Sequence, residues 1–225
     1  MINAEIKAIF FDYYGTLVNV GRPFDKIKQW FEIKLRSHNA NVDIDRFNLN
    51  FSKQRAKLLY TGFFMTGMQL LTESYKRTCE KFGVAAYIDE FIWEVTYLFT
   101  EPIAFQKTAE IIAKLKQRYK IALITNADNN FLYESIKKNS FDFDFIVSSE
   151  DACCNKPGYG IFYHAMSVAN LPVNQLLMVG DSIAEDIIPA KELGMDVIWL
   201  NMEDKPEHDP GVLSIQNLSE LLVTT

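Results

Sequence analysis

The 225-residue sequence is poor in cysteine and has no long apolar run. Its three cysteines, Cys79, Cys153 and Cys154, are odd in number and two are adjacent, so we expect no disulfide framework. This pattern is typical of a protein from the reducing cytoplasm. No apolar stretch approaches the roughly eighteen residues of a membrane span, and the N-terminus lacks the pattern of a secretory signal peptide. We therefore expect a soluble cytoplasmic protein.

Basic residues are also outnumbered. The sequence has 23 Lys and Arg against 29 Asp and Glu, which gives a net charge of -6 at pH 7. Such a chain has no basic face to neutralise phosphates, which argues against nucleic acid as a partner. Positive charge inside a small-molecule pocket is still compatible with this balance. Apolar residues make up 48%, enough for a sizeable core.

The first part of the chain changes its pattern abruptly. An apolar strand is expected over about residues 5–12, and a region rich in aromatic residues with helical periodicity follows it. Within this region we expect helices over about 24–35, 44–60, 67–82 and 87–99. Pro102 ends it.

The rest of the sequence alternates short apolar strands with helices. We expect strands over 121–124, 145–147, 176–179 and 197–200. Helices are expected around 111–115, 129–138, 159–169 and 183–193. Continuous apolar strands that alternate with helices indicate a parallel sheet covered on both faces. The sequence thus predicts a doubly wound, Rossmann-like α/β core domain formed by 1–18 and 101–225, with an inserted all-helical domain over 19–100.

Reactive side chains follow three of the expected strands. Asp12 ends the first strand, Thr125 and Asn126 end the second, and Asp181 follows Gly180 at the end of another. The carboxyl ends of parallel strands form the active crevice in sheets of this type. We therefore expect these side chains to meet although they lie far apart in the sequence.

Four short motifs in this order resemble those of the haloacid dehalogenase superfamily, whose hydrolases use an aspartate nucleophile. They are Asp12-Tyr13-Tyr14-Gly15-Thr16, Ile124-Thr125-Asn126, Lys156-Pro157, and Gly180-Asp181-Ser182 with Asp186. The resemblance covers nearly the whole core, and the insert is similar to the family's cap domains only in being helical. It implies that Asp12 is the covalent nucleophile, which attacks phosphorus or an alkyl carbon to form an ester that water opens.

A metal ion is expected beside the nucleophile. Asp181 and Asp12 would repel each other at one site unless a cation neutralised them, and Mg²⁺ is the natural occupant for oxygen ligands. The resemblance adds the backbone carbonyl of Tyr14 as a ligand. It also implies supporting positions for Thr16 and Asp186, with Asp186 orienting metal-bound water and the lysine.

The remaining motifs suggest a site for a phosphoryl group. The hydroxyl of Thr125 and the amide of Asn126 can bond phosphoryl oxygens, and Lys156 is a point charge suited to phosphate or to holding the nucleophile. Ordinary turn chemistry is the alternative explanation for Thr125 and Asn126. Taken alone, a lysine is more often a surface residue.

Tyr14 points to a different chemistry. Most phosphatases of this superfamily carry a second aspartate there as general acid, whereas the dehalogenase branch reads Asp-x-Tyr-Gly-Thr, because a halide leaves without a proton. By the same resemblance, dehalogenases hold no metal and replace the aspartate that Asp181 matches with a hydroxyl residue. They have a tyrosine where this chain has Phe162, and they need a cap arginine, for which Arg55 is a loose candidate. A solvated helix face explains Arg55 equally well.

We therefore predict a Mg²⁺-dependent phosphohydrolase that acts on a small phosphorylated metabolite. Its expected residues are Asp12 and Lys156 for catalysis, Thr125, Asn126 and Lys156 for the phosphoryl group, and Asp12, Tyr14 and Asp181 for the metal. One alternative is a 2-haloacid dehalogenase. Another is a low-turnover protein that binds or senses a phosphometabolite, because the general acid is missing.

Overall fold

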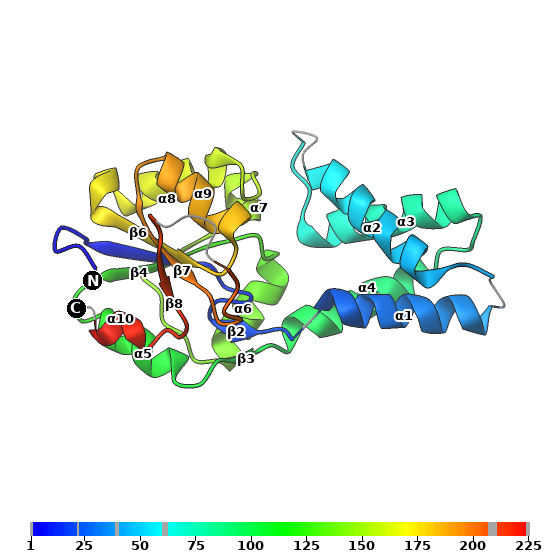
Figure 1. Ribbon diagram of the computed structural model, residues 1–225, viewed down its shortest axis with the longest axis horizontal. Coiled ribbons are helices and arrows are strands. Elements are labelled where there is room, and N and C mark those ends of the chain that lie inside the picture. Colours follow the sequence, from blue (N-terminus) through cyan, green and yellow to red (C-terminus); the bar gives the residue numbers. More distant parts are fainter. Residues whose placement is uncertain (1, 22, 39–40, 60–62, 207–210, 224–225) are drawn as a thin grey trace. The chain divides into compact units, whose positions relative to one another are not determined.

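The chain forms two compact units in the computed structural model (Figure 1). The α/β unit comprises Met1–Asn19 and Pro102–Thr225, and the helical unit comprises Val20–Glu101. The structure describes residues 2–21, 23–38, 41–59, 63–206 and 211–223. Residue 60, at the end of one expected helix, lies outside these ranges.

The α/β unit is built on a six-stranded sheet whose neighbouring strands are all parallel. The strand order is β5-β4-β1-β6-β7-β8. The strands are β1 (Ala8–Phe11), β4 (Lys120–Thr125), β5 (Phe145–Ser148), β6 (Leu176–Gly180), β7 (Asp196–Leu200) and β8 (Leu213–Ile215). The predicted parallel α/β core is confirmed.

The register brings the predicted site positions to one edge. Phe11, the last residue of β1, pairs with Leu123 of β4 on one side and with Val179 of β6 on the other. Asp12 follows Phe11 directly, so it lies at the centre of the sheet, between the carboxyl ends of two neighbouring strands. The two neighbours end at Thr125 and Gly180.

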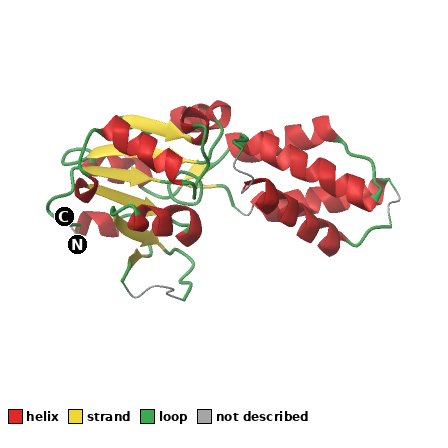
Figure 2. Ribbon diagram, turned by 90° about the horizontal axis from the view of Figure 1, so that it is seen from above, coloured by secondary structure: helices red, strands yellow, loops and turns green. Residues whose placement is uncertain are grey.

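Helices cover both faces of this sheet (Figure 2). One face packs on α5 (Thr108–Leu115), α6 (Asn129–Lys138) and α10 (Glu220–Val223), and the other on α8 (Tyr159–Ala169) and α9 (Ile188–Glu192). The side chains of β1 alternate between the two cores: Ile9 and Phe11 join the first, and Ala8 and Phe10 join the second. All four are buried, which explains why this strand reads as a continuous apolar run.

Several short elements were not predicted. They are the antiparallel pair β2 (Val18–Asn19) and β3 (Ile103–Ala104), the edge strand β8, the short helices α7 (Ser149–Ala152) and α10, and the 3₁₀ turn η1 (Val173–Gln175). The helix expected over 183–193 begins instead as a π-helical turn, η2 (Ile183–Ile187), before α9. Elements of two to five residues are too short to show a hydrophobic period.

In the described residues of the helical unit there are four helices, which Figure 2 shows packed together. They are α1 (Pro23–Ser37), α2 (Ile44–Leu59), α3 (Gly67–Phe82) and α4 (Ile88–Thr100). Local signals fix the ends of α3, because Thr66 and Gln69 form a capping box and Gly83 adopts a left-handed conformation at its C-terminus. Within the described ranges, no helix is long and apolar enough to cross a membrane.

Aromatic side chains form the core of the helical unit. Phe31 of α1 is 1% exposed, and its ring lies 5.0–5.8 Å from those of Phe47, Phe51, Tyr75 and Phe91. These rings come from α2, α3 and α4, so one phenylalanine joins all four helices. The aromatic richness of this region therefore serves packing.

We expect Phe31→Ala to lower the free energy of unfolding by about 3–5 kcal/mol, because it removes a buried ring and leaves a cavity. Ile33 on the same helix is 65% exposed, so Ile33→Ala is the matched control and should change it by less than about 0.5 kcal/mol. Urea unfolding followed by near-ultraviolet circular dichroism measures both. Equal effects of the two substitutions would contradict this account of the core.

Candidate active site

A buried lysine connects two of the aspartates at the edge of the sheet. The ammonium nitrogen of Lys156 lies 2.7 Å from Oδ1 of Asp12 and 2.5 Å from Oδ1 of Asp186. Lys156 is 1% exposed, Asp12 8% and Asp186 1%. A charge of this kind is tolerated away from water only when it is paired, and here two carboxylates pair it.

Asp181 is held against the loop that follows β1. Its Oδ1 accepts a hydrogen bond from the hydroxyl of Thr16 at 2.9 Å, and its backbone N–H donates back to the same hydroxyl at 3.1 Å. The indole N–H of Trp199, on β7, donates to the backbone carbonyl of Asp181 at 3.0 Å. These bonds fix the backbone and side chain of Asp181 from two directions.

Two glycines allow the carboxylates to come so close to the backbone. Gly15 has a φ of +90°, and a Cβ there would lie 2.8 Å from Oδ2 of Asp181. At Gly180 a Cβ would lie 2.3 Å from Oδ2 of Asp186. Any side chain would collide at either position, which gives a physical reason for the glycines in the first and fourth motifs.

Both oxygens of Asp186 are used inside the protein. Oδ1 contacts Lys156, and Oδ2 accepts the backbone N–H of Ser182 at 3.1 Å. Asp12 and Asp181 therefore provide the carboxylates better suited to bind a metal ion. The Tyr14–Gly15 peptide lies next to them, because Gly15 approaches the Asp181 carboxylate.

The cluster fits a hard divalent cation. Asp12, Asp181 and Asp186 each offer an oxygen, and these atoms lie within 4.8 Å of one another. Three carboxylates face the single ammonium of Lys156, so the group has an excess of negative charge when ionised. Carboxylate and carbonyl oxygens are the ligands that Mg²⁺ prefers.

Burial changes the acid–base properties of these groups. Loss of water, together with the Asp12 charge, raises the pKa of Asp181 to about 6. Burial also raises the pKa of Asp186, although the Lys156 ammonium opposes this. For Lys156, burial by itself would lower the pKa, but the charges of Asp12 and Asp186 outweigh it and raise the pKa above its ordinary value.

The second motif lies beside the lysine. Thr125 is 1% exposed, and its hydroxyl oxygen accepts the N–H of Ala127 at 3.2 Å. The side chain of Asn126 bonds both backbone groups of Lys156 and, through its amide, Oε2 of Glu185. Glu185 and Trp199 also contact residues of the site, and neither stands out in the sequence as a site residue. Glu185 follows Ser182 as an acid in the first turn of a helix, which is common, and no local pattern distinguishes Trp199.

The two tyrosines after Asp12 differ in their surroundings. Tyr13 is fully buried, and its hydroxyl donates to Oγ of Ser135 on α6 at 2.7 Å. The ring of Tyr14 packs edge-on against Tyr13, with centroids 5.1 Å apart. Burial, followed by the charges of its neighbours, raises the pKa of Tyr14 well above its ordinary value, so this phenol stays protonated at neutral pH.

Two further candidates have packing roles in the structure. Phe162 is fully buried in the core between α8 and the sheet. The guanidinium of Arg55 lies 4.6 Å from the centroid of the Phe24 ring, within the helical unit. This cation–π contact gives the Arg55 side chain a packing role that requires no bound halide.

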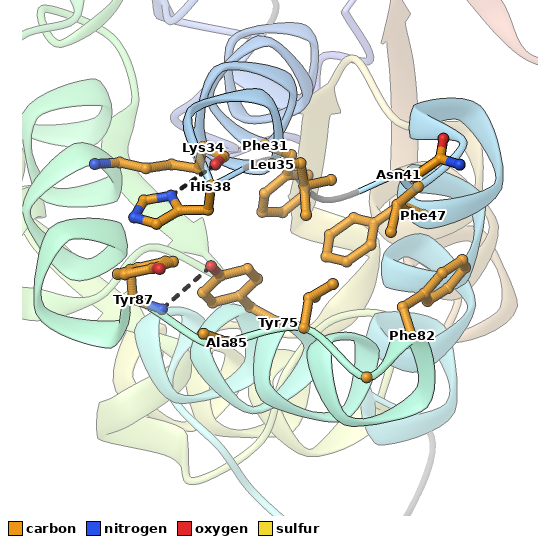
Figure 3. A pocket seen from close by; sticks show the side chains of 13 residues that line it. Phe31, Lys34, Leu35, His38, Asn41, Phe47, Tyr75, Phe82, Ala85 and Tyr87 are labelled. Carbon is orange, nitrogen blue, oxygen red and sulfur yellow. Dashed lines mark hydrogen bonds between the residues drawn. The ribbon is translucent and has the colours of Figure 1, made fainter.

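The helical unit contains a cavity of about 550 Å³ between α1, α2 and α3 (Figure 3). Aromatic and aliphatic side chains line it, including Phe31, Phe47 and Tyr75. Two of its polar groups have partners inside the unit: Lys34 pairs with Glu90, and the Tyr75 hydroxyl accepts the N–H of Tyr87.

The sequence profile of the haloacid dehalogenase-like hydrolases matches residues 6–194 of the chain. This chain belongs to that hydrolase family. The match runs from the first strand to the end of α9 and spans all the motifs described above.

Among known proteins, both phosphatases and dehalogenases resemble this chain. Glyceraldehyde 3-phosphate phosphatase from Pyrococcus furiosus is 27% identical over 97% of this chain and 93% of its own length. A dehalogenase crystal structure superposes with a TM-score of 0.76 at 19% identity, covering 100% and 99% of the two chains. The HAD-hydrolase YfnB from Bacillus subtilis, solved bound to magnesium, superposes with a TM-score of 0.74 at 18% identity, covering 97% and 98%.

The raised pKa of Asp181 makes stability depend on pH in the metal-free protein. On folding, the pKa of Asp181 rises from the ordinary 3.8 to about 6. Ionisation of Asp181 therefore lowers the free energy of unfolding, by on the order of 2–3 kcal/mol. The protonated carboxyl favours the folded state below pH 4, and this contribution is lost as the pH rises through 6. Asp181→Asn removes the ionisable group. We therefore expect the stability of the variant, relative to that of the wild type, to increase as the pH is raised from 4.5 to 7.5.

Urea unfolding in chelator at the two pH values measures this difference. Asp196→Asn, in which a half-buried aspartate on β7 changes, is the control and should show no comparable gain. A difference between wild type and Asp181→Asn that is independent of pH would refute the electrostatic account of the cluster.

Proposed function

We propose that this hydrolase is a Mg²⁺-dependent phosphatase of a small phosphorylated metabolite, with Asp12 as its nucleophile. The observation that carries the proposal is the position of Asp181 beside Asp12 in a cluster where three carboxylates face one ammonium. An acidic site of this kind attracts a cation and repels a free carboxylate substrate. A cation bound there would in turn attract a phosphate ester.

The comparisons support this choice. The Pyrococcus furiosus relative, which spans nearly the whole chain, is a phosphatase. YfnB, which shares the fold, was solved with magnesium. In this proposal, Asp12, Asp181 and the carbonyl of Tyr14 would hold Mg²⁺. The bound ion would offset negative charge on the phosphoryl group and on the aspartates.

The side chains then have distinct tasks. Lys156 holds Oδ1 of Asp12, so the nucleophile has a fixed orientation. A carboxylate oxygen of Asp12 forms a bond to phosphorus while the bond to the leaving oxygen breaks, and that oxygen takes a proton from water. A second water then attacks the phosphorus, which releases inorganic phosphate and regenerates the carboxylate.

Thr125 and Lys156 are the proposed ligands of the phosphoryl group. The Thr125 hydroxyl oxygen accepts the Ala127 N–H, which orients its own proton as a donor. Lys156 contributes positive charge from the same edge of the sheet. The side-chain amide of Asn126 has its hydrogen bonds within the protein, so we assign it no direct phosphate contact.

A 2-haloacid dehalogenase is the second candidate, and Tyr14 is the observation that favours it. A phenol with a raised pKa is a poor proton donor to an alkoxide, whereas a halide needs none. Against it stand the excess negative charge near Asp12 and the packing role of Arg55. A phosphometabolite-binding protein of low turnover is the third candidate, because it would also lack the general acid.

The first test of this function is the nucleophile itself. Asp12→Asn should abolish turnover, since an amide is a poor nucleophile, and circular dichroism should show an intact fold. The assay is a screen of phosphorylated metabolites and 2-haloacids, each with Mg²⁺ and with chelator. Phosphatase activity that requires Mg²⁺ is the expected result. Haloacid turnover in chelator would overturn the proposal in favour of a dehalogenase.

Mg²⁺ should also raise the melting temperature of the wild type, because a ligand that binds only the folded state stabilises it. Asp181→Asn should blunt this rise. Asp142, which is on the surface and pairs with Lys116, offers the matched control Asp142→Asn, which should respond like the wild type. The same melting temperature for the wild type in Mg²⁺ and in chelator would contradict a metal site.

Tyr14→Asp should supply the missing general acid. Such a group typically contributes about 10²–10⁴-fold, so turnover of an alkyl phosphate should rise by part of that factor. p-Nitrophenyl phosphate should gain less, because its leaving group needs little protonation. Mg²⁺ binding should persist, since the proposed ligand at this position is a backbone carbonyl. Lower turnover on both substrates by a folded, metal-binding variant would show that Tyr14 has a role of its own.

A further inference from the structure

The segment that carries Lys156 lies between two helices, α7 and α8. The backbone N–H and carbonyl of Lys156 have no backbone partner in either helix or in the sheet, yet buried backbone groups need partners. Asn126 supplies both of them. The Lys156 N–H donates to Oδ1 of Asn126 at 2.7 Å, and Nδ2 of Asn126 donates to the Lys156 carbonyl at 3.0 Å.

Glu185 engages the other hydrogen of the same amide. Nδ2 of Asn126 lies 3.2 Å from Oε2 of Glu185. Glu185 is itself anchored, because its backbone N–H donates to Oγ of Ser182 at 3.2 Å. Asp186, the next residue of the η2 turn, binds the ammonium of Lys156. The turn thus contacts Lys156 twice, through its side chain directly and through its backbone by way of Asn126.

We propose that Asn126 and Glu185 are positioning residues that set the place of Lys156, and that the Asn126 amide does not bind substrate. An asparagine side chain has two N–H donors and one carbonyl, and each already has a partner. A substrate contact would have to break one of these bonds. The proposal deepens the proposed function and rests on it only for the role of Lys156 in turnover.

The physical reason is the length of the lysine side chain. Its flexible four-carbon stem separates the ammonium from the backbone, so ion pairs alone fix one end only. When the backbone is also clamped, the ammonium keeps its place between Asp12 and Asp186. A displacement of about 1 Å at a catalytic group can cost roughly 10²-fold in rate.

The experiment compares Asn126→Ala, Asn126→Asp and Glu185→Gln with the double variant Asn126→Asp/Glu185→Gln. Asn174→Ala is the matched control, because Nδ2 of Asn174 donates to Oε2 of Glu5 at 3.0 Å on the surface, the same type of bond. The first readout is reductive methylation of Lys156 by formaldehyde and cyanoborohydride without substrate. Mass spectrometry scores it against the exposed Lys137 of the same molecule.

We expect Lys156 to be protected in the wild type, in Asn174→Ala and in Glu185→Gln, whose carboxamide oxygen still accepts the hydrogen bond. In Asn126→Ala and Asn126→Asp it should be methylated several-fold faster. The second readout is steady-state kinetics, in which these two variants should lose about 10–10²-fold in kcat with little change in KM.

The double variant keeps the test decisive if Asn126→Ala fails to fold. The carboxylate introduced by Asn126→Asp would repel Glu185, whereas the carboxamide introduced by Glu185→Gln can donate a hydrogen bond to that carboxylate. The double variant should therefore recover part of the protection and of the kcat lost by Asn126→Asp alone.

Unchanged methylation in the Asn126 variants, or a rise in KM alone, would overturn the proposal in favour of substrate binding by Asn126. If no phosphate ester is hydrolysed by the wild type, the proposed function fails, and the methylation pattern still decides the role of Asn126.

Discussion

The paired charges of Lys156, Asp12 and Asp186 are the interaction on which the site depends. An ammonium this deeply buried needs carboxylate partners, which lie at 2.7 and 2.5 Å, and removal of both would leave a buried charge uncompensated. Asp12 directly follows β1, Asp186 lies in the η2 turn, and Lys156 lies in the segment before α8. The parallel sheet brings these three parts of the chain to one edge.

A second constraint is the excess of negative charge that this pairing leaves. Asp181 adds a third carboxylate, and Gly15 and Gly180 have no side chains where the carboxylates approach the backbone. The Thr16 and Trp199 hydrogen bonds hold Asp181 in this position, although burial and the Asp12 charge raise its pKa to about 6. The protein thus maintains a locally unfavourable group of charges, which is the usual mark of a functional site.

The fold supports more than one chemistry, so these residues have to decide the function. Dehalogenases and a magnesium-bound hydrolase superpose on this chain about equally well. Asp181 favours phosphoryl transfer with a cation, and Tyr14 favours a leaving group that needs no proton. These two residues come from different motifs and point to different reactions. The proposed function rests on the charges around Asp12, because electrostatic stabilisation of the reacting group is usually the largest contribution to catalysis.

The sequence by itself determined the parallel α/β core and the edge where the site lies, because buried strands are continuous apolar runs and their polar ends are visible, as at Asp12 and Asp181. It could not show the short elements, which have no measurable period, or the partners of individual side chains. Asn126 was expected to bind phosphate, yet in the structure its amide bonds Lys156 and Glu185. Phe162 matched a phosphatase pattern and is a core residue. Only the tertiary structure shows these contacts, because each joins segments far apart in the chain.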